Sequence, residues 1–300
     1  MFEIEPLTGR CGALLPEAVH VCVGVSPFNG YFSAPRLLRL AEWSLRRFPY
    51  VHFFVPDTVA AYTLEALGYP PGRARHKARR QGQYVHNKIC SALRELGVPD
   101  PDGLVLGMDR LERSPRYTTL LNEARLRFRR DQGFRSACLE ASHWVLDQRL
   151  PPGTSPTAEQ LHGAVRYFLA ELPLFADAGG IAGRRPSFFA YHQRVPFLER
   201  FFGRELGWEP ADTQGFLVVR DPAPEDAAAG LREGRPADGA LAGEAATGGA
   251  FTGGLPAGGV ATGGLTAGGL ATGDLTAGDL PIGGLTTGGL PAGEALRARR

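Results

Sequence analysis

The sequence predicts an α/β fold in which helices flank a parallel β-sheet. Short apolar runs, of the kind that a parallel sheet buries on both faces, recur through roughly the first 220 residues. Amphipathic segments with helical periodicity lie between these runs. Because strands and helices alternate along the chain, we expect consecutive strands to be joined by helical crossovers.

The first strand-helix-strand unit occupies the first 55 residues. Residues 17–25 (EAVHVCVGV) are predicted to form a buried strand that stops at Ser26. After the next loop, Ser33 suits a helix N-cap and Pro35 suits an early helical position, and residues 51–55 (VHFFV) form the following strand. This unit places the Ser26 loop at the carboxyl end of a strand, where open α/β sheets bind their ligands.

The remaining elements alternate in the same way. We expect helices over 75–96, over 116–149 and from Ser155 to about Glu171 or Leu172, and strands over 103–108, 187–192 and 215–220. Gly82 weakens the first of these helices, because an interior glycine costs about 1 kcal/mol relative to alanine. Pro173 is expected to end the third helix, since proline disfavours helical backbone at the residue before it.

Residues 221–300 differ in composition from the rest of the chain. They contain 21 of the 40 glycines and a single aromatic residue, Phe251, so they hold little that could fill a core. Glycine stands at every fifth position from Gly243 to Gly293. This period weakly resembles the pentapeptide repeats that wind into four-sided β-helices, but the glycine content favours disorder. We therefore expect one folded domain over residues 1–220 and a disordered tail over 221–300.

The expected folded domain carries an excess of positive charge. Residues 1–220 contain 28 basic and 22 acidic residues, a net charge of +6. No acidic residue lies between Glu65 and Glu95, where seven basic residues occur. Such a cluster is either a solvated helix face or a surface for a polyanion such as RNA. The candidates for contacts with the phosphates of such a polyanion are Arg73, Lys77, Arg80 and Lys88.

The cysteines and the first residues bear on metal binding and location. The four cysteines form no CxxC pair and show no histidine at metal-ligand spacing, so we expect free thiols and no metal site. The segment MFEIEPLTGR has two acids where a secretory signal needs basic residues and an apolar core. No apolar run approaches the 18 residues of a membrane span. These observations predict a cytoplasmic protein that does not enter a membrane.

Three short clusters carry side chains suited to chemistry. Ser26 directly follows a buried strand, so its hydroxyl is either a nucleophile on a rigid element or a turn serine bonded to its own backbone. Tyr167 and Glu171 are four apart on a helix and either grip one small group, such as an ammonium, or form a solvated pair. Tyr191 and His192 follow the apolar run SFFA and are a weak signal on their own.

The order and spacing of the three clusters resemble those of the cyclodipeptide synthases over about residues 18–220. The matching segments are GVSPFNGYFS, YFLAELPLFAD and AYHQRVPF. The sequence resembles the branch of that family that has Asn, Tyr and His at the positions of Asn29, Tyr191 and His192. The resemblance implies a Rossmann-like sheet similar to the catalytic domains of class I tyrosyl- and tryptophanyl-tRNA synthetases, without their ATP chemistry. The sequence has no HIGH-like, KMSKS-like or P-loop element, which agrees with this expectation.

The resemblance further implies a monomer that makes cyclodipeptides from two aminoacyl-tRNAs by a ping-pong route, without a metal or an organic cofactor. Ser26 would attack the ester of the first aminoacyl-tRNA and carry the aminoacyl group. Tyr167 and Glu171 would hold its amino group, Glu171 would help to deprotonate it, and Tyr191 would relay a proton during ring closure. Asn29 and His192 would support these groups, and the amino-acid pocket would be lined by Cys22, Gly24, Phe54, Leu174 and Phe189. The polyanion at the basic segment would then be tRNA, with its phosphates bound by Arg73, Lys77, Arg80 and Lys88.

Two other functions remain as alternatives. A serine hydrolase is suggested by Gly24-Val25-Ser26, but its nucleophile elbow needs several preceding strands and a glycine where Phe28 stands. A non-catalytic tRNA- or RNA-binding module would explain the basic segment and leave the three clusters to coincidence. The sequence leaves open which amino acids are joined, what activates Ser26 and what the tail does.

Overall fold

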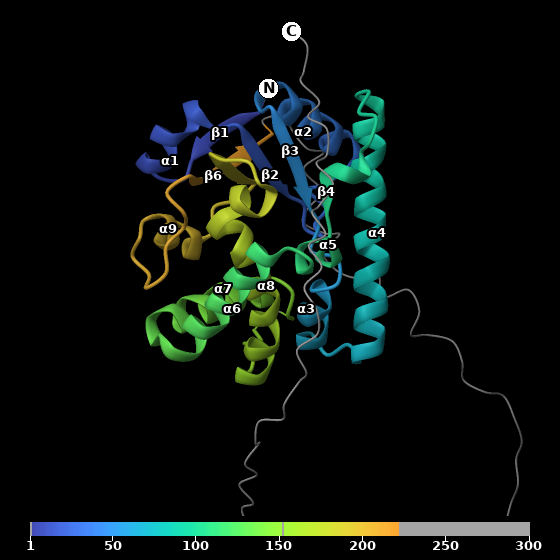
Figure 1. Ribbon diagram of the computed structural model, residues 1–300. Helices are drawn as coiled ribbons and strands as arrows, with labels where there is room; N and C mark the ends of the chain where they lie inside the picture. Colours follow the sequence, from blue (N-terminus) through green and yellow to red (C-terminus); the bar gives the residue numbers. More distant parts are fainter. Residues whose placement is uncertain (1, 152, 222–300) are drawn as a thin grey trace, which may run out of the picture. The chain divides into compact units, whose positions relative to one another are not determined.

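A computed structural model of the protein describes residues 2–151 and 153–221. The tail predicted to be disordered, or to form pentapeptide coils, lies outside the described residues from position 222 onward. Within the described chain, six strands form one sheet in the order β1-β6-β5-β2-β3-β4 (Figure 1). The strands are β1 (Glu3–Pro6), β2 (His20–Gly24), β3 (Tyr50–Phe54), β4 (Val105–Leu106), β5 (Ser187–Tyr191) and β6 (Gln214–Arg220).

The sheet is parallel except at one edge. β1 pairs antiparallel with β6, and every other neighbouring pair is parallel. All five residues of β2 are buried, in agreement with the predicted central strand. Each large apolar side chain buried in this way contributes about 1.5–3 kcal/mol to stability. The predicted α/β fold with a parallel sheet is confirmed, and an antiparallel edge strand is added to it.

The edge strand β1 was not predicted. Its sequence, EIEP, contains no apolar run, and its four residues are exposed or partly exposed. Charged residues and proline are the means by which edge strands avoid pairing with other chains. The pattern of a buried strand is therefore absent from β1 for a physical reason.

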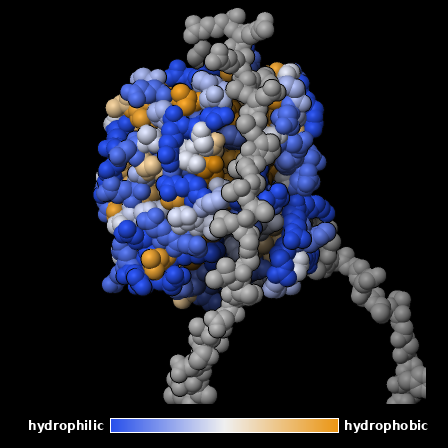
Figure 2. All heavy atoms as spheres, viewed as in Figure 1, coloured by the Kyte–Doolittle hydropathy of each residue, from blue (hydrophilic) through white to orange (hydrophobic). Residues whose placement is uncertain are grey.

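Helices cover the faces and one end of the sheet. They are α1 (Gly9–Leu14), α2 (Ala34–Arg47), α3 (Ala60–Ala66), α4 (Pro71–Glu95), α5 (Met108–Glu112), α6 (Pro115–Arg130), α7 (Gln132–Asp147), α8 (Ala158–Ala182) and α9 (Pro196–Phe202), with 3₁₀ turns η1 (Leu15–Glu17) and η2 (Asp102–Leu104). α8 packs on β2, β5 and β6, whereas α2 packs on β3 and α4. α4 stands beside β4 at the end of the sheet, and its surface in Figure 2 is mostly hydrophilic.

The single helix predicted over 116–149 is in fact two helices. Asp131 ends α6 with extended backbone and at once caps α7, because its side chain accepts a hydrogen bond from the backbone N–H of Phe134 at 3.0 Å. An aspartate in this position satisfies one of the free N–H groups at a helix start. Helical periodicity continues across the break, so the sequence pattern alone missed it.

The prediction that Pro173 ends its helix is wrong. α8 continues nine residues beyond the proline to Ala182, and it begins after Thr157, which forms a capping box with Gln160, rather than at Ser155. An interior proline disrupts the backbone hydrogen bonds of the preceding turn. The hydroxyl of Tyr117 donates to the carbonyl of Ala170, in the turn before the proline, at 2.9 Å. Almost every residue from Phe168 to Gly179 is buried, and this packing stabilises the segment. The backbone leaves helical geometry at Asp177, with a φ of −164° and a ψ of 59°, so α8 is kinked four residues after the proline.

α4 begins at Pro71, four residues earlier than predicted, and Gly82 lies in its interior. A Cβ placed on Gly82 would stand 2.4 Å from the Cβ of Asp57, in the turn after β3. Only glycine allows the helix to come so close to this turn. The glycine that weakens the helix locally is therefore required by packing. None of the helices in the described chain has the length and apolar character needed to cross a bilayer.

Candidate active site

Two neighbouring parallel strands bring Ser26 and Tyr191 together. Ser26 follows β2, and Tyr191 is the last residue of β5; the two strands pair with Val23 opposite Ala190. Their carboxyl ends therefore meet at the same edge of the sheet. The Oγ of Ser26 lies 3.0 Å from the phenolic oxygen of Tyr191, and either group can be the donor. The structure gives Ser26 a side-chain partner that sequence reasoning did not identify.

Asn29 and His192 support this pair from the side. The Nδ2 of Asn29 lies 3.0 Å from the Nε2 of His192, while its Oδ1 accepts from the backbone N–H of Tyr31 at 3.0 Å. The His192 ring also stacks on the ring of Tyr31, with centroids 4.0 Å apart. Burial, with a smaller effect from the charge of Arg36, lowers the pKa of His192 to about 3. A neutral His192 accepts the hydrogen bond at Nε2 and fixes the orientation of the Asn29 amide.

The loop that holds Ser26 and Asn29 is strained at one residue. Phe28 has a φ of 64°, in the left-handed region that residues other than glycine rarely adopt. Its side chain packs, together with that of Tyr167, against a small cluster of buried residues from α3 and α4. Strained backbone of this kind is concentrated at functional sites, where the surrounding packing maintains it. The packing of Phe28 thus connects the serine loop to α8.

Tyr167 and Glu171 lie one turn apart on α8, as predicted, and their side chains are joined by a hydrogen bond. Burial raises the pKa of Glu171 to about 7, and the bond from Tyr167 opposes the shift only in part. Burial, followed by the negative charge of Glu171, raises the pKa of Tyr167 well above its usual value. Burial likewise raises the pKa of Tyr191. The site therefore contains two neutral phenols and one carboxyl group that titrates near neutral pH.

The helix pair and the serine pair belong to one site. The charge of Glu171 acts on both tyrosines, and Tyr191 in turn affects the pKa of Tyr167. Asn29 also forms a side-chain hydrogen bond with Tyr191. The structure thus places together all six side chains that were predicted to act in catalysis: Ser26, Asn29, Tyr167, Glu171, Tyr191 and His192.

Arg149 is a site residue that sequence reasoning missed. It lies in the exposed segment between α7 and α8, and its positive charge lowers the pKa of both Tyr167 and Tyr191 against the larger effect of burial. In the sequence, Arg149 is a single basic residue outside any motif. Its proximity to the two tyrosines therefore could not be predicted without the fold. Arg149 therefore places a positive charge near both tyrosines.

Four of the five residues expected to line an amino-acid pocket lie in one buried core cluster, and the fifth, Gly24, is buried next to it. Gly24, Phe54 and Phe189 come from the adjacent strands β2, β3 and β5. A Cβ on Gly24 would stand 2.7 Å from the ring of Phe189 and 3.4 Å from that of Tyr191. Cys22 and Leu174 are fully buried, at 0% exposure. These residues form an apolar surface that lies next to Tyr191 at Gly24.

The four basic residues predicted to contact tRNA extend along α4. Arg73 and Arg80 are exposed, and Lys77 and Lys88 are partly buried. Three of them lie over aromatic rings: Arg73 and Lys77 are 5.9 and 4.5 Å from the ring centre of Tyr69, and Lys88 is 4.4 Å from that of Tyr84. Lys77 also donates to the hydroxyl of Tyr69 at 2.9 Å. They form a basic surface along the helix.

The statement that no histidine stands at metal-ligand spacing from a cysteine is wrong. His86 and Cys90 are four residues apart on α4, a ligand spacing that the sequence analysis overlooked, and Asp102 approaches both. The Oδ1 of Asp102 lies 2.7 Å from His86 Nε2 and accepts from the Cys90 thiol at 3.7 Å. Burial, with the nearby charge of Asp102, raises the pKa of Cys90 to about 11, so the thiol stays protonated. All four cysteines are free thiols, as predicted.

Comparison with known proteins identifies the family. A profile described as cyclodipeptide synthase matches residues 2–221. The cyclo(L-tyrosyl-L-tyrosyl) synthase of Mycobacterium tuberculosis is 33% identical over 73% of this chain and 75% of its own length. The cyclo(L-leucyl-L-leucyl) synthase of Bacillus subtilis is 32% identical over 74% and 90%.

Solved structures lead to the same family. A cyclodipeptide synthase from Bacillus thermoamylovorans has a TM-score of 0.69 at 28% identity and covers 73% of this chain and 96% of its own. A Mycobacterium tuberculosis protein, reported to relate cyclodipeptide synthetases to type I tRNA synthetases, has a TM-score of 0.65 at 33% identity, with coverage of 73% and 93%. With the fold, the converging side chains and these similarities in agreement, this chain belongs to the cyclodipeptide synthase family.

Proposed function

We propose that this protein makes cyclodipeptides from two aminoacyl-tRNAs by a ping-pong mechanism through Ser26. The observation that carries the proposal is the contact between Ser26 and Tyr191, at 3.0 Å, beside a carboxyl group that titrates near pH 7. The family relationship supports the formation of cyclodipeptides. The use of aminoacyl-tRNA and the order of steps are inferred from the chemistry of the site.

In the first half-reaction, the Oγ of Ser26 attacks the ester carbonyl carbon of an aminoacyl-tRNA. The new bond joins this carbon to Oγ, and the bond between the carbon and the terminal ribose oxygen breaks. Tyr191 is well placed to take the serine proton while its own proton passes to the departing ribose oxygen. Because one ester replaces another, no ATP is needed.

In the second half-reaction, the aminoacyl group on Ser26 becomes the nucleophile. Tyr167 and Glu171 bind its ammonium group, and the ionised Glu171 carboxylate accepts a proton to free the amine. The amine attacks the ester carbonyl carbon of a second aminoacyl-tRNA. A new C–N bond forms, the bond from this carbon to the ribose oxygen breaks, and the second tRNA leaves with a proton lost by the amine, so that a dipeptidyl-enzyme remains. The free amine of the dipeptide then attacks the Ser26 ester, closes the six-membered ring and releases Oγ, which regains a proton from Tyr191.

Recognition of the tRNA is assigned to phosphate contacts. The exposed cations of α4 follow one face of a 25-residue helix, as a basic surface for an acceptor stem requires. The amino-acid pocket is assigned to the apolar wall of Gly24, Phe54 and Phe189, so apolar side chains are the expected substrates. Binding through phosphates would be sequence-independent and would weaken steeply with salt.

The experiment supplies the purified full-length protein with a complete set of charged tRNAs and searches the products for cyclodipeptides by mass spectrometry. We expect wild-type protein to form at least one cyclodipeptide and Ser26→Ala to form none while it still binds tRNA. A wild-type protein that binds charged tRNA but releases no cyclic product would favour the non-catalytic RNA-binding alternative. Release of free amino acids alone would favour a hydrolase.

A further inference from the structure

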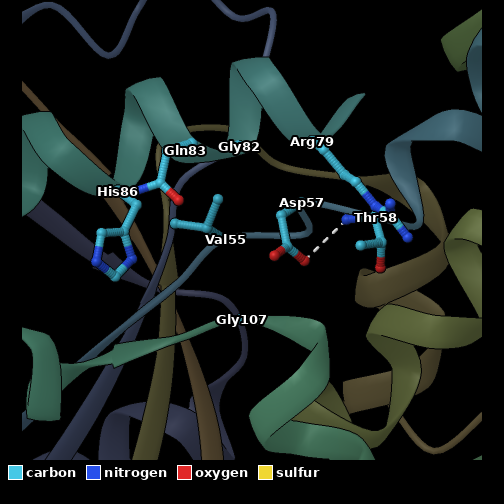
Figure 3. A pocket seen from close by; sticks show the side chains of 8 residues that line it. All are labelled: Val55, Asp57, Thr58, Arg79, Gly82, Gln83, His86 and Gly107. Atoms are coloured by element: carbon cyan, nitrogen blue, oxygen red, sulfur yellow. Dashed lines mark hydrogen bonds between the residues drawn. The ribbon is translucent and has the colours of Figure 1, made fainter. Parts of the chain in front are cut away.

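A polar cavity beside α4 is not used by the steps described so far. It has a volume of about 270 Å³ and is lined by Val55, Asp57, Thr58, Arg79, Gly82, Gln83, His86 and Gly107 (Figure 3). Pockets for small ligands begin at about 300 Å³. The cavity therefore has room for one compact group, and its walls are mostly polar or charged.

The cavity lies at the same edge of the sheet as Ser26. Asp57 and Thr58 follow β3, and Gly107 follows β4. The backbone N–H of Val25 donates to Phe54 at 2.9 Å, so the chain that leads to Ser26 runs directly beside the end of β3. Neighbouring strands lie about 4.8 Å apart. The cavity is thus close to Ser26. It lies at the carboxyl ends of β3 and β4, beneath α4.

Asp57 is fixed as a hydrogen-bond acceptor. Its Oδ1 accepts from the backbone N–H groups of Thr58 at 2.8 Å and Met108 at 3.1 Å. Its Oδ2 faces Gly107, since a Cβ on that glycine would stand 3.2 Å away, and no donor within the described chain reaches this oxygen. One carboxylate oxygen is therefore anchored, and the other is available to a ligand that donates hydrogen bonds.

A cation faces this carboxylate across the cavity. Arg79, Gln83 and His86 are spaced along one face of α4, and Arg79 extends from the helix toward the turn of Asp57 and Thr58 (Figure 3). Arg79 is exposed and has no hydrogen bond or ion pair within the described residues. Gln83 and His86 are already engaged with Asn87 and Asp102, at 2.9 and 2.7 Å. Asp57 and Arg79 are thus the groups left to bind a ligand.

We propose that this cavity is a subsite for a ribose phosphate, and that the unit it receives is the terminal nucleotide of the tRNA. A ribose hydroxyl donates to Oδ2 of Asp57, and the adjoining phosphate accepts from the guanidinium of Arg79. The ester that Ser26 attacks is carried on this ribose, so the subsite would position the reacting carbon. The inference rests on the proposed use of aminoacyl-tRNA and names the part of that substrate that this cavity binds.

The test measures binding, which is independent of product formation. Uncharged tRNA, either intact or lacking its terminal adenosine, is titrated with wild-type protein, Asp57→Asn and Arg79→Ala at one salt concentration. We expect loss of the adenosine to weaken wild-type binding about tenfold, the effect of losing hydrogen bonds to charged groups. Both variants should bind intact tRNA about tenfold more weakly and should no longer distinguish the two RNAs.

Arg75→Ala is the matched control. Arg75 is an exposed cation of α4 that lies 3.9 Å from Glu65 and does not line the cavity. It should weaken binding of both RNAs equally or not at all, and so keep the tenfold ratio. Asp57→Asn retains the oxygen that caps Thr58 and Met108, so its melting temperature should stay close to that of the wild type. If Asp57→Asn does unfold, the test rests on Arg79→Ala, because Arg79 is exposed and its replacement should leave the fold intact. The measurement is whether this variant still distinguishes the two RNAs.

Three results would overturn the assignment: equal wild-type binding of the two RNAs, variants that discriminate as the wild type does, or loss of the ratio in Arg75→Ala. Adenosine 5′-monophosphate provides a further arm. If it binds in an Asp57-dependent manner while the terminal adenosine has no effect, the cavity serves a free nucleotide and not tRNA. Absence of cyclodipeptide from a protein that discriminates the RNAs would instead count against the proposed function alone.

Discussion

At the scale of single residues, the site combines a hydroxyl, two phenols and a carboxyl group with a pKa near neutrality. Burial raises the pKa of Glu171 to about 7, although Tyr167 donates a hydrogen bond to it. A group with this pKa exchanges protons readily at the pH of a cell. It binds an ammonium when ionised and can hold the proton that the ammonium loses.

The rate of cyclodipeptide formation should follow the ionisation of Glu171. We expect the rate to rise with pH through about 7, where the carboxylate forms, and Glu171→Gln to be at least about 100-fold slower with no such limb. The measurement is a pH profile of product formation at saturating substrate. A Glu171→Gln enzyme that keeps the limb at pH 7 would assign the titration to another group.

The raised pKa of Glu171 also affects stability. Activity should rise with pH, whereas stability should fall. The folded pKa of Glu171 lies above the unfolded value, so the stability contributed by its neutral form is complete below about pH 4.5 and is lost as pH rises through 7. Glu171→Gln avoids the cost of burying the charge. It should therefore unfold at a higher temperature than the wild type at pH 8 and at a similar temperature at pH 4.5. A variant that is less stable at pH 8 would contradict this account.

At the scale of secondary-structure elements, sequence patterns predicted the strands and helices whose formation depends on burial. They did not predict features that depend on contacts between residues far apart in the chain. The apolar runs of β2 and β5 predicted their strands, because both are buried. Pro173 was expected to end α8, but the hydroxyl of Tyr117, more than fifty residues away, bonds to a carbonyl of the turn before the proline. The bond between Ser26 and Tyr191, separated by 165 positions, likewise depends on the order of strands in the sheet.

Gly24 should not tolerate a side chain. A Cβ there would lie 2.7 Å from the Phe189 ring, which is held by Phe54, Phe175 and Phe216 and cannot move freely. We expect Gly24→Ala to lower the free energy of unfolding by about 1–3 kcal/mol, the usual cost of overpacking, and to slow product formation by displacing Tyr191. In Gly12→Ala, the matched control, the nearest atom would be 3.9 Å away, so stability should not fall. Equal effects of the two substitutions would contradict the packing argument.

A histidine pair joins the first residue of β2, the buried His20, to the middle of β3, where His52 is partly buried. His20 Nδ1 lies 2.7 Å from Ser187 Oγ, and His20 Nε2 lies 2.9 Å from His52 Nδ1. Burial, together with the charges of Arg110 and Arg184, lowers the pKa of His52 to about 4. Because the unfolded histidine binds a proton below about pH 6.5, stability should be present above that pH and fall as pH approaches 4.

The slope of this acid loss can be measured by denaturant unfolding. We expect His52→Asn to remove up to about 1.4 kcal/mol per pH unit of the dependence between pH 6 and 4.5, the contribution of one proton. His143→Asn, on the exposed surface of α7, is the control and should leave the slope unchanged. A slope in His52→Asn equal to that of the wild type would show that other groups cause the acid loss.

At the scale of the whole molecule, the sequence sufficed to predict the α/β class, the order of most elements and the three clusters that meet in the site. The antiparallel strand β1 and the position of Arg149 could not be predicted, because neither leaves an apolar or motif signal in the chain. The segment 222–300 contributes none of the residues of the candidate site, and the family match ends at residue 221.

We therefore expect a protein truncated after Asp221 to fold and to make the same cyclodipeptide at a rate within about twofold of the full chain. Asp221 should be retained, because it pairs with Arg36 at 3.2 Å and with Arg39 and so ties the end of β6 to α2. Product formation and thermal unfolding of the two proteins provide the comparison. A truncated protein that is folded but inactive would assign a catalytic or binding role to the segment 222–300.

The central claim is that Ser26 carries the first aminoacyl group covalently. The most direct measurement is the intact mass of the protein after brief incubation with a single kind of aminoacyl-tRNA and an acid quench, followed by peptide mapping. The account predicts an added mass of one aminoacyl group on the peptide that contains Ser26, and no such addition or cyclic product in Ser26→Ala. Cyclodipeptide formation by Ser26→Ala at the wild-type rate, or an aminoacyl group mapped to another residue, would contradict it.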